Sequence, residues 1–99
     1  MTYELVFHDL ALKEWRKLGA PVREQFKNKL AERQRDPHVP AARIRSENAR
    51  YKIKLRSSGY RLVYEVRDAQ VLIMVIAIGK RERAKVHRKA ADRSGNGGL

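Results

Sequence analysis

The sequence predicts one α+β domain in which a strand and two helices precede three strands and a last helix. Three patterns predict this order. Apolar residues recur at helical spacing within 10–35, alternate with charged residues within 50–64, and form an unbroken run at 71–78. The chain has 99 residues, which support one modest hydrophobic core and are too few for two.

A strand and a first helix are expected near the start of the chain. Residues 2–7 are rich in strand formers, and Asp9 is expected to cap a helix over residues 10–18 that Gly19 ends. Trp15 shares the apolar stripe of this helix with its neighbours one turn away. We therefore expect Trp15 to lie in the core rather than to stack on a ligand.

The second helix is predicted to begin near Pro21 and to end at Asp36-Pro37, which makes a helical hairpin. Its apolar stripe repeats every four residues and consists of Val22, Phe26 and Leu30. Residues 37–49 contain two prolines, mixed charges and no period, so we expect a connecting loop.

The end of the chain is expected to hold a central strand, a basic helix and a tail. The run VLIMVIAIG, at 71–79, has no alternation and several β-branched residues, which is typical of a strand covered on both faces, and Gly79 is expected to end it. Residues 80–93 permit a helix, and residues 94–99 are expected to form a flexible tail. We therefore expect a single domain over residues 1–93.

The charge of the chain indicates an anionic partner. There are 23 Lys and Arg against 11 Asp and Glu, which gives a net charge of +12 at pH 7. Most of the excess follows residue 42, because residues 43–99 hold 15 basic and 5 acidic side chains. Nucleic acid is the expected partner of such a chain. A hydrophobic fraction of 42% argues against intrinsic disorder.

The composition argues against several other classes of protein. The chain has no cysteine, and His8, His38 and His87 do not follow metal-ligand spacing, so we expect neither a metal nor another cofactor. The first residues lack the pattern of a secretory signal, and the apolar run at 71–78 is too short to span a bilayer. We expect a cytoplasmic protein without membrane contact.

The stretch RYKIKLRSSGYRLVY, residues 50–64, predicts a β-hairpin with one apolar and one cationic face. Side chains alternate across a strand, so Tyr51, Ile53 and Leu55 are expected to face the core. The opposite face then collects four cations of the first strand: Arg50, Lys52, Lys54 and Arg56.

A two-residue turn at Ser58-Gly59 is expected to set Leu55 opposite Leu62 and Arg56 opposite Arg61. A like-charge pair of this kind is unfavourable by a few tenths to ~1 kcal/mol. We therefore expect an anion to bind there and to offset the repulsion.

Three segments carry a resemblance to a known family: ALKEWRKLGAPVREQ, YKIKLRSSGYRLVYE and VLIMVIAIGKRER. They closely resemble the bacterial RelE toxin family, the ribosome-dependent messenger-RNA endonucleases of toxin–antitoxin systems, over residues 3–90. The resemblance implies a RelE-like, microbial ribonuclease-like fold. In this fold the helical hairpin packs on one face of a mainly antiparallel sheet of about four strands, and the other face is concave and basic.

The resemblance also implies cleavage of messenger RNA in the ribosomal A site, by attack of a ribose 2′-hydroxyl on the adjacent phosphate without a metal ion. Such a reaction needs a base, cations for the developing charge and a proton source for the leaving oxygen. We expect Lys54 to act as the base, with electrostatic support from Lys52. Arg61 is expected to clamp the phosphate, and Arg81 to assist the leaving oxygen.

His87 stands in the last predicted helix, where many relatives carry a tyrosine. Imidazole can stack on a base as tyrosine does, and it titrates near neutrality, so His87 is a candidate acid–base group. The alternative is a solvent-facing histidine without a role. His8 and His38 are assigned no functional role.

Other basic side chains are expected to position messenger or ribosomal phosphates: Arg45, Arg56, Lys80 and Arg83. The partners implied by the resemblance are messenger RNA, the ribosome near the 16S rRNA of the A site, and an acidic RelB-like antitoxin. Operator DNA is expected to be contacted only through the antitoxin.

Two other functions stay open on the sequence alone. ParE toxins share the fold and inhibit DNA gyrase without enzymatic activity, although they lack this set of lysines and arginines. A basic RNA-binding module would use the same face without cleaving RNA. A site that only binds phosphate and a site that cleaves RNA use the same residue types, so the sequence alone does not separate them.

Overall fold

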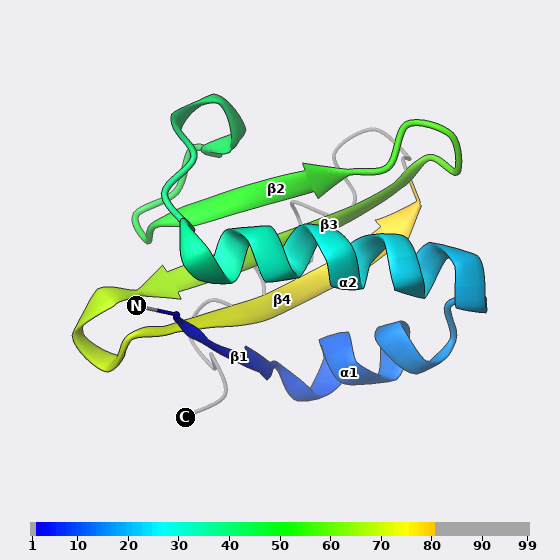
Figure 1. Ribbon diagram of the computed structural model, residues 1–99, viewed down its shortest axis with the longest axis horizontal. Helices are drawn as coiled ribbons and strands as arrows, with labels where there is room; N and C mark the ends of the chain where they lie inside the picture. Colours follow the sequence, from blue (N-terminus) through cyan, green and yellow to red (C-terminus); the bar gives the residue numbers. More distant parts are fainter. Residues whose placement is uncertain (1, 81–99) are drawn as a thin grey trace.

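The computed structural model describes residues 2–80 (Figure 1). The predicted order of elements is found throughout this part of the chain: β1 Glu4–Phe7, α1 Asp9–Arg16, α2 Ala20–Arg35, β2 Arg50–Lys54, β3 Tyr60–Arg67 and β4 Leu72–Lys80, with 3-10 turns at Pro40–Ala42 and Asp68–Gln70. β4 continues one residue beyond Gly79, which was predicted to end it. The predicted last helix beyond Lys80 and the predicted tail at 94–99 lie outside the described residues.

The four strands form one mixed sheet in the order β1-β4-β3-β2. β1 pairs with β4 in parallel, whereas the β3–β4 and β2–β3 pairs are antiparallel. Both helices lie on the same face of this sheet (Figure 1). The predicted arrangement of a helical hairpin on a mainly antiparallel sheet is therefore confirmed.

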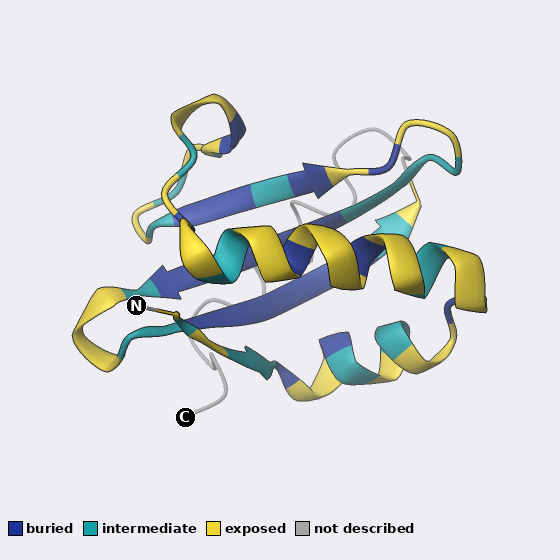
Figure 2. Cartoon of the chain, viewed as in Figure 1, coloured by how far each residue is buried: buried dark blue, intermediate teal, exposed yellow. Residues whose placement is uncertain are grey.

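The main core lies between the helices and the sheet. Phe26 and Leu30, from the predicted stripe of α2, are completely buried there, and the ring of Trp15 packs against the core at 5.2 Å from that of Phe7. The opposite face of the sheet has a second buried cluster, formed by Val63, Met74, Ile76 and Ala77. β4 is thus buried on both faces, as its sequence predicts (Figure 2).

The ends of the two helices differ from the prediction. His8, and not Asp9, caps α1, because His8 has an extended backbone and its Nδ1 accepts a hydrogen bond from the Leu10 N–H at 3.2 Å. α1 ends at Arg16, and Gly19 is the N-cap of α2 rather than the end of α1. Pro21 then occupies the first turn of α2, as predicted.

The register of the β2–β3 hairpin differs by two residues from the predicted one. The connecting loop spans residues 56–59, because the Leu55 N–H donates to the Tyr60 carbonyl at 2.9 Å and Gly59 takes the left-handed conformation, with φ +77°. Lys54, and not Arg56, therefore lies opposite Arg61. A shift by two residues leaves every side chain on its predicted face, so the division into two faces is correct and only the pairing is wrong.

A polar network joins the loop after α2 to both edges of the sheet. Asp68 Oδ1 accepts a hydrogen bond from the Tyr3 hydroxyl at 2.6 Å and lies 2.8 Å from His38 Nε2, while His38 Nδ1 lies 2.9 Å from the Tyr51 hydroxyl. The hydrogen bond from Tyr3, followed by that with His38, lowers the pKa of the Asp68 carboxyl because both stabilise its charged form. His38 thus has a structural role that its sequence context did not indicate.

We predict that Asp68→Asn makes the protein less sensitive to acid. The pKa of Asp68 is lower in the folded chain than in the unfolded one, so its carboxylate stabilises the fold above about pH 4, and this contribution disappears as the pH falls through the folded value. Urea denaturation over a pH series should show that the difference in unfolding free energy between the wild type and the variant shrinks in acid. Glu47→Gln, an exposed loop change, is the control, and a pH-independent difference for Asp68→Asn would contradict the prediction.

We also predict that Gly59→Ala destabilises the hairpin by about 1 kcal/mol, because an alanine at φ +77° is strained although nothing lies within 4 Å of its Cβ position. Gly59→Asn should cost less, since asparagine tolerates the left-handed conformation better. Chemical denaturation measures both, with Ser57→Ala in the same loop as a control. Equal stabilities of the alanine and asparagine variants would show that the backbone conformation of residue 59 does not matter.

Candidate functional site

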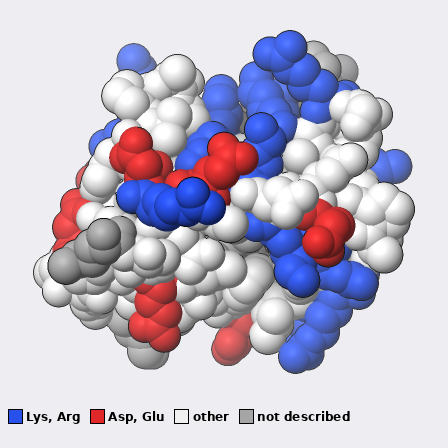
Figure 3. Space-filling view, in the orientation of Figure 1, with Lys and Arg blue, Asp and Glu red and all other residues white. Residues whose placement is uncertain are grey.

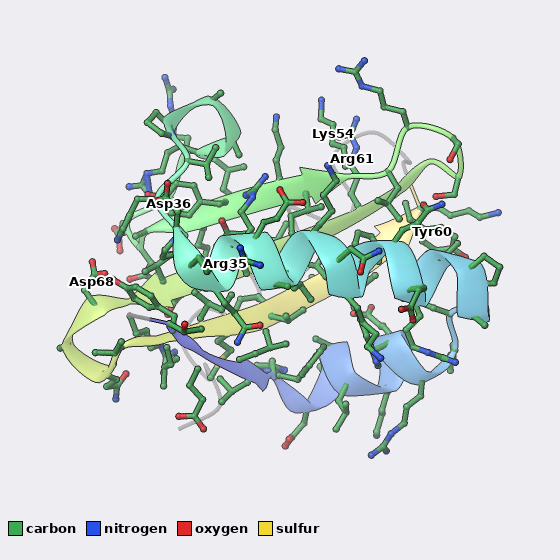
Figure 4. The ribbon with its side chains drawn as sticks, viewed as in Figure 1. Arg35, Asp36, Lys54, Tyr60, Arg61 and Asp68 are labelled. Carbon is green, nitrogen blue, oxygen red and sulfur yellow. The ribbon has the colours of Figure 1, made fainter. Side chains whose placement is uncertain are left out.

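Two basic residues face each other at the loop end of the hairpin. Lys54, the last residue of β2, pairs directly with Arg61, the second residue of β3. Lys54 is exposed and Arg61 is half-buried, and Figure 4 shows them side by side at this end of the sheet. Directly opposed side chains in an antiparallel pair have Cβ atoms about 5 Å apart, so both can contact one anion.

Lys52 completes a group of three cations on the same face. It lies two residues before Lys54, so its side chain points the same way, and it is half-buried opposite Val63. Within residues 2–80, neither Lys52 nor Arg61 forms an ion pair. The arrangement is a concentration of positive charge on a rigid hairpin, which suits a phosphate group.

A cavity of about 310 Å³ opens at this end of the hairpin. The residues of the described part of the chain that line it are Lys54, Leu55, Arg56, Gly59, Tyr60 and Arg61. A water molecule occupies about 30 Å³ of liquid, so the cavity has room for a phosphate with part of its sugar. Two of the predicted catalytic residues, Lys54 and Arg61, thus border a space of suitable size.

Tyr60 is a residue of this site that the sequence analysis missed. It borders the cavity, and Lys80 Nζ lies 5.6 Å from the centroid of its ring, within the range of a cation–π contact. The only signal in the sequence was an aromatic residue directly before Arg61. Lys80, predicted to bind RNA, is exposed and is brought to the same end of the sheet by its pairing with Tyr60.

The other predicted RNA-positioning residues lie on two exposed loops that flank β2. Arg56 is exposed in the hairpin loop, and Arg45 is exposed in the loop before β2. That second loop is held by Arg43, whose Nη1 donates to the Asn48 carbonyl at 3.2 Å, and by the Ser46 hydroxyl, which accepts from the Asn48 N–H at 3.3 Å. Arg81, Arg83 and His87, which were also predicted to act, lie outside the described residues.

Arg50 does not contribute to the cationic surface as the alternation predicts. It is only 1% exposed, and it forms an ion pair with Glu65, its direct partner on β3. The alternation gives the direction of a side chain but not its partner, which is why the prediction failed here. Among residues 2–80, the accessible cations on this face of the hairpin therefore include Lys52, Lys54 and Arg61 but not Arg50.

The helix-covered face of the described residues carries charges of both signs, and acidic and basic side chains are interspersed there (Figure 3). Within residues 2–80, no cluster of three His, Asp or Glu side chains is arranged to hold a metal ion. No helix in the same range has the length and apolar character needed to cross a membrane.

The sequence is similar to known toxins along nearly its whole length. Residues 5–85 match the family model described as the ParE toxin of the type II toxin–antitoxin system, parDE. The mRNA interferase toxin RelE of Escherichia coli K12 and the mRNA interferase RelE of Shigella flexneri are each 55% identical to this chain over 93 residues. These alignments cover 94% of this chain and 98% of each relative.

Solved structures agree with this similarity. A double mutant of the E. coli toxin RelE in the free state matches with a TM-score of 0.87 and 53% identity, over 94% of this chain and 98% of that one. A chain of the intact E. coli RelBE toxin–antitoxin complex matches with a TM-score of 0.78 and 57% identity, over 82% and 99%. Although the matching family model is described as ParE, the relatives that share more than half of their residues with this chain along nearly its whole length are RelE proteins, so the chain belongs to the RelE family of mRNA interferase toxins.

Proposed function

We propose that this interferase cleaves messenger RNA in the ribosomal A site by attack of a ribose 2′-hydroxyl on the adjacent phosphate, without a metal ion. The observation that supports this most directly is the cross-strand pair of Lys54 and Arg61 beside a cavity large enough for a phosphate. Two directly opposed cations repel each other, and a phosphate bound between them would offset that repulsion. The pair therefore favours an anion whose charge increases during the reaction.

Lys54 is the proposed general base, and Lys52 and Arg61 supply the charge around it. A lysine close to other cations loses its proton more readily, because a like charge disfavours the protonated form. Arg61 can hold two non-bridging oxygens with its planar guanidinium, whereas Lys52 stabilises the developing charge as a compact ammonium group. The three residues come from a paired hairpin, so their spacing is set by the sheet and not by a mobile loop.

Further residues complete the proposed site. Arg81 and His87 are assigned to the leaving oxygen and to proton transfer, with His87 in the position where many relatives carry tyrosine. Messenger or ribosomal phosphates are then positioned by the remaining basic residues: Arg45, Arg56, Lys80 and Arg83.

An acidic RelB-like antitoxin is the proposed partner that silences the toxin. The E. coli relative is known in an intact RelBE complex and bound to a RelB peptide. This chain carries most of its net charge after residue 42, so an acidic segment that covers the hairpin would neutralise the site. Contact with operator DNA would then depend on the antitoxin.

We predict that Lys54→Ala lowers the single-turnover rate of messenger cleavage on the ribosome by about a hundredfold to ten-thousandfold, the usual contribution of a general base. Ribosome affinity should change little, because Lys54 is one of many cations. Lys29→Ala, an exposed change on α2, is the matched control for loss of one lysine. An unchanged cleavage rate in Lys54→Ala would remove Lys54 from the mechanism.

We predict that His87→Phe and His87→Tyr differ in activity. Phenylalanine preserves stacking but cannot transfer a proton, whereas tyrosine is the residue found in many relatives. Loss of proton transfer and loss of stacking would lower the cleavage rate by overlapping amounts, because stacking alone is worth about 1–3 kcal/mol. The pH–rate profile must therefore separate the two effects. The limb of the pH–rate profile near neutrality should disappear in both variants. Full activity of His87→Phe with an unchanged pH–rate profile would show that His87 is a surface residue without a role in the reaction.

A further inference from the structure

A buried network of charges lies on the same face of the hairpin as the proposed site, at the other end of β2 and β3. Arg50 Nε and Nη2 are both 3.0 Å from Glu65 Oε1, and Arg67 Nε is 2.8 Å from Glu65 Oε2. One carboxylate thus binds two guanidinium groups, with a different oxygen for each. Glu65 is the single acidic residue of β2 and β3.

This network is far less accessible than the proposed site. Arg50 is 1% exposed and Glu65 is 6% exposed, and the Arg67 side chain is 16% exposed. Lys54, by contrast, is exposed and borders the cavity together with Arg61. On the face of the hairpin that points away from the helices, Glu65 therefore pairs with the cations at one end, Arg50 and Arg67, while Lys54 and Arg61 border the cavity at the other end and Lys52 lies between them.

The two kinds of cation lie close enough to compete for one RNA strand. Arg50 is two residues before Lys52 on β2, and Glu65 is two residues beyond Val63, the partner of Lys52. Residues two apart on a strand are about 7 Å from each other, which is close to the spacing of successive phosphates in an extended strand. Without Glu65, β2 and β3 would carry basic side chains and no acidic one.

We propose that Glu65 is a specificity-determining residue of the RNA site: by sequestering Arg50 and Arg67 it confines RNA phosphates to the end of the hairpin that carries Lys54 and Arg61. This inference rests on the proposed function, because it takes RNA as the ligand of that end. Glu65 acts through the two arginines and touches no substrate, so it is a positioning residue and not a catalytic one.

The test compares how salt weakens the binding of RNA to two variants with the same change in charge. Glu65→Gln keeps the shape of the side chain and removes the negative charge that pairs with both guanidinium groups, whereas Glu32→Gln removes an exposed carboxylate on α2. The probe is a short 2′-O-methyl oligoribonucleotide, which binds but cannot be cleaved by 2′-hydroxyl attack. Its affinity is measured over a series of salt concentrations.

We expect Glu32→Gln to keep the wild-type dependence on salt. In Glu65→Gln the slope of log affinity against log salt should become steeper by about 0.7 for each guanidinium that reaches a phosphate. Equal slopes in the two variants would overturn the proposal. Because binding is measured without cleavage, a normal cleavage rate in Lys54→Ala would overturn the proposed chemistry and leave this result standing.

A second measurement uses the wild-type protein, since Glu65→Gln leaves a buried guanidinium uncompensated and can fail to fold. Phenylglyoxal modifies accessible arginines, and mass spectrometry gives the rate at each one. Arg61 should react quickly and be protected by the oligoribonucleotide, whereas Arg50 and Arg67 should react slowly at rates that RNA does not change. Protection of Arg67 by RNA to the same extent as Arg61 would overturn the proposal.

Discussion

The pairing of β2 with β3 is the constraint on which both the core and the proposed site depend. It places Tyr51 and Ile53 in the core beneath the helices, and by the same alternation it sends Lys52 and Lys54 to the opposite face. A slip by one residue would bury the lysines and expose the core, so the apolar side chains keep the cations in place. The stability of the sheet and the position of the charges are thus two consequences of one register.

The sequence predicted the two faces of this hairpin but not the partner of each residue. Alternation is a local property, and it is unchanged by a shift of two residues, so the assignment of faces tolerated the wrong turn. The pairing depends on the loop, which spans residues 56–59 because Gly59 adopts the left-handed conformation. Arg56 was therefore predicted opposite Arg61, where Lys54 is found.

Contacts between side chains that are far apart in the sequence were the feature of the fold that the sequence predicted least well. His38 and Asp68 are 30 residues apart and meet only because the loop after α2 packs beside the end of β3. Arg50 looked like another exposed cation of the alternating strand, and only its contact with Glu65 shows why it is buried. Periodicity gives the direction of a side chain, whereas burial of a charge depends on a partner that the tertiary fold supplies.

The distribution of these contacts explains how the sheet tolerates a concentration of like charge. The Asp68 network and the ion pairs of Glu65 lie toward one end of β2 and β3, whereas Lys54 and Arg61 face each other at the loop end. Opposed cations cost a few tenths to about 1 kcal/mol, a small fraction of the free energy of a folded domain. The buried residues on both faces of β4 can support that cost. Lys54 and Arg61 face each other at the loop end, so an anion bound between them would offset their mutual repulsion and turn it into a source of affinity for the proposed RNA phosphate.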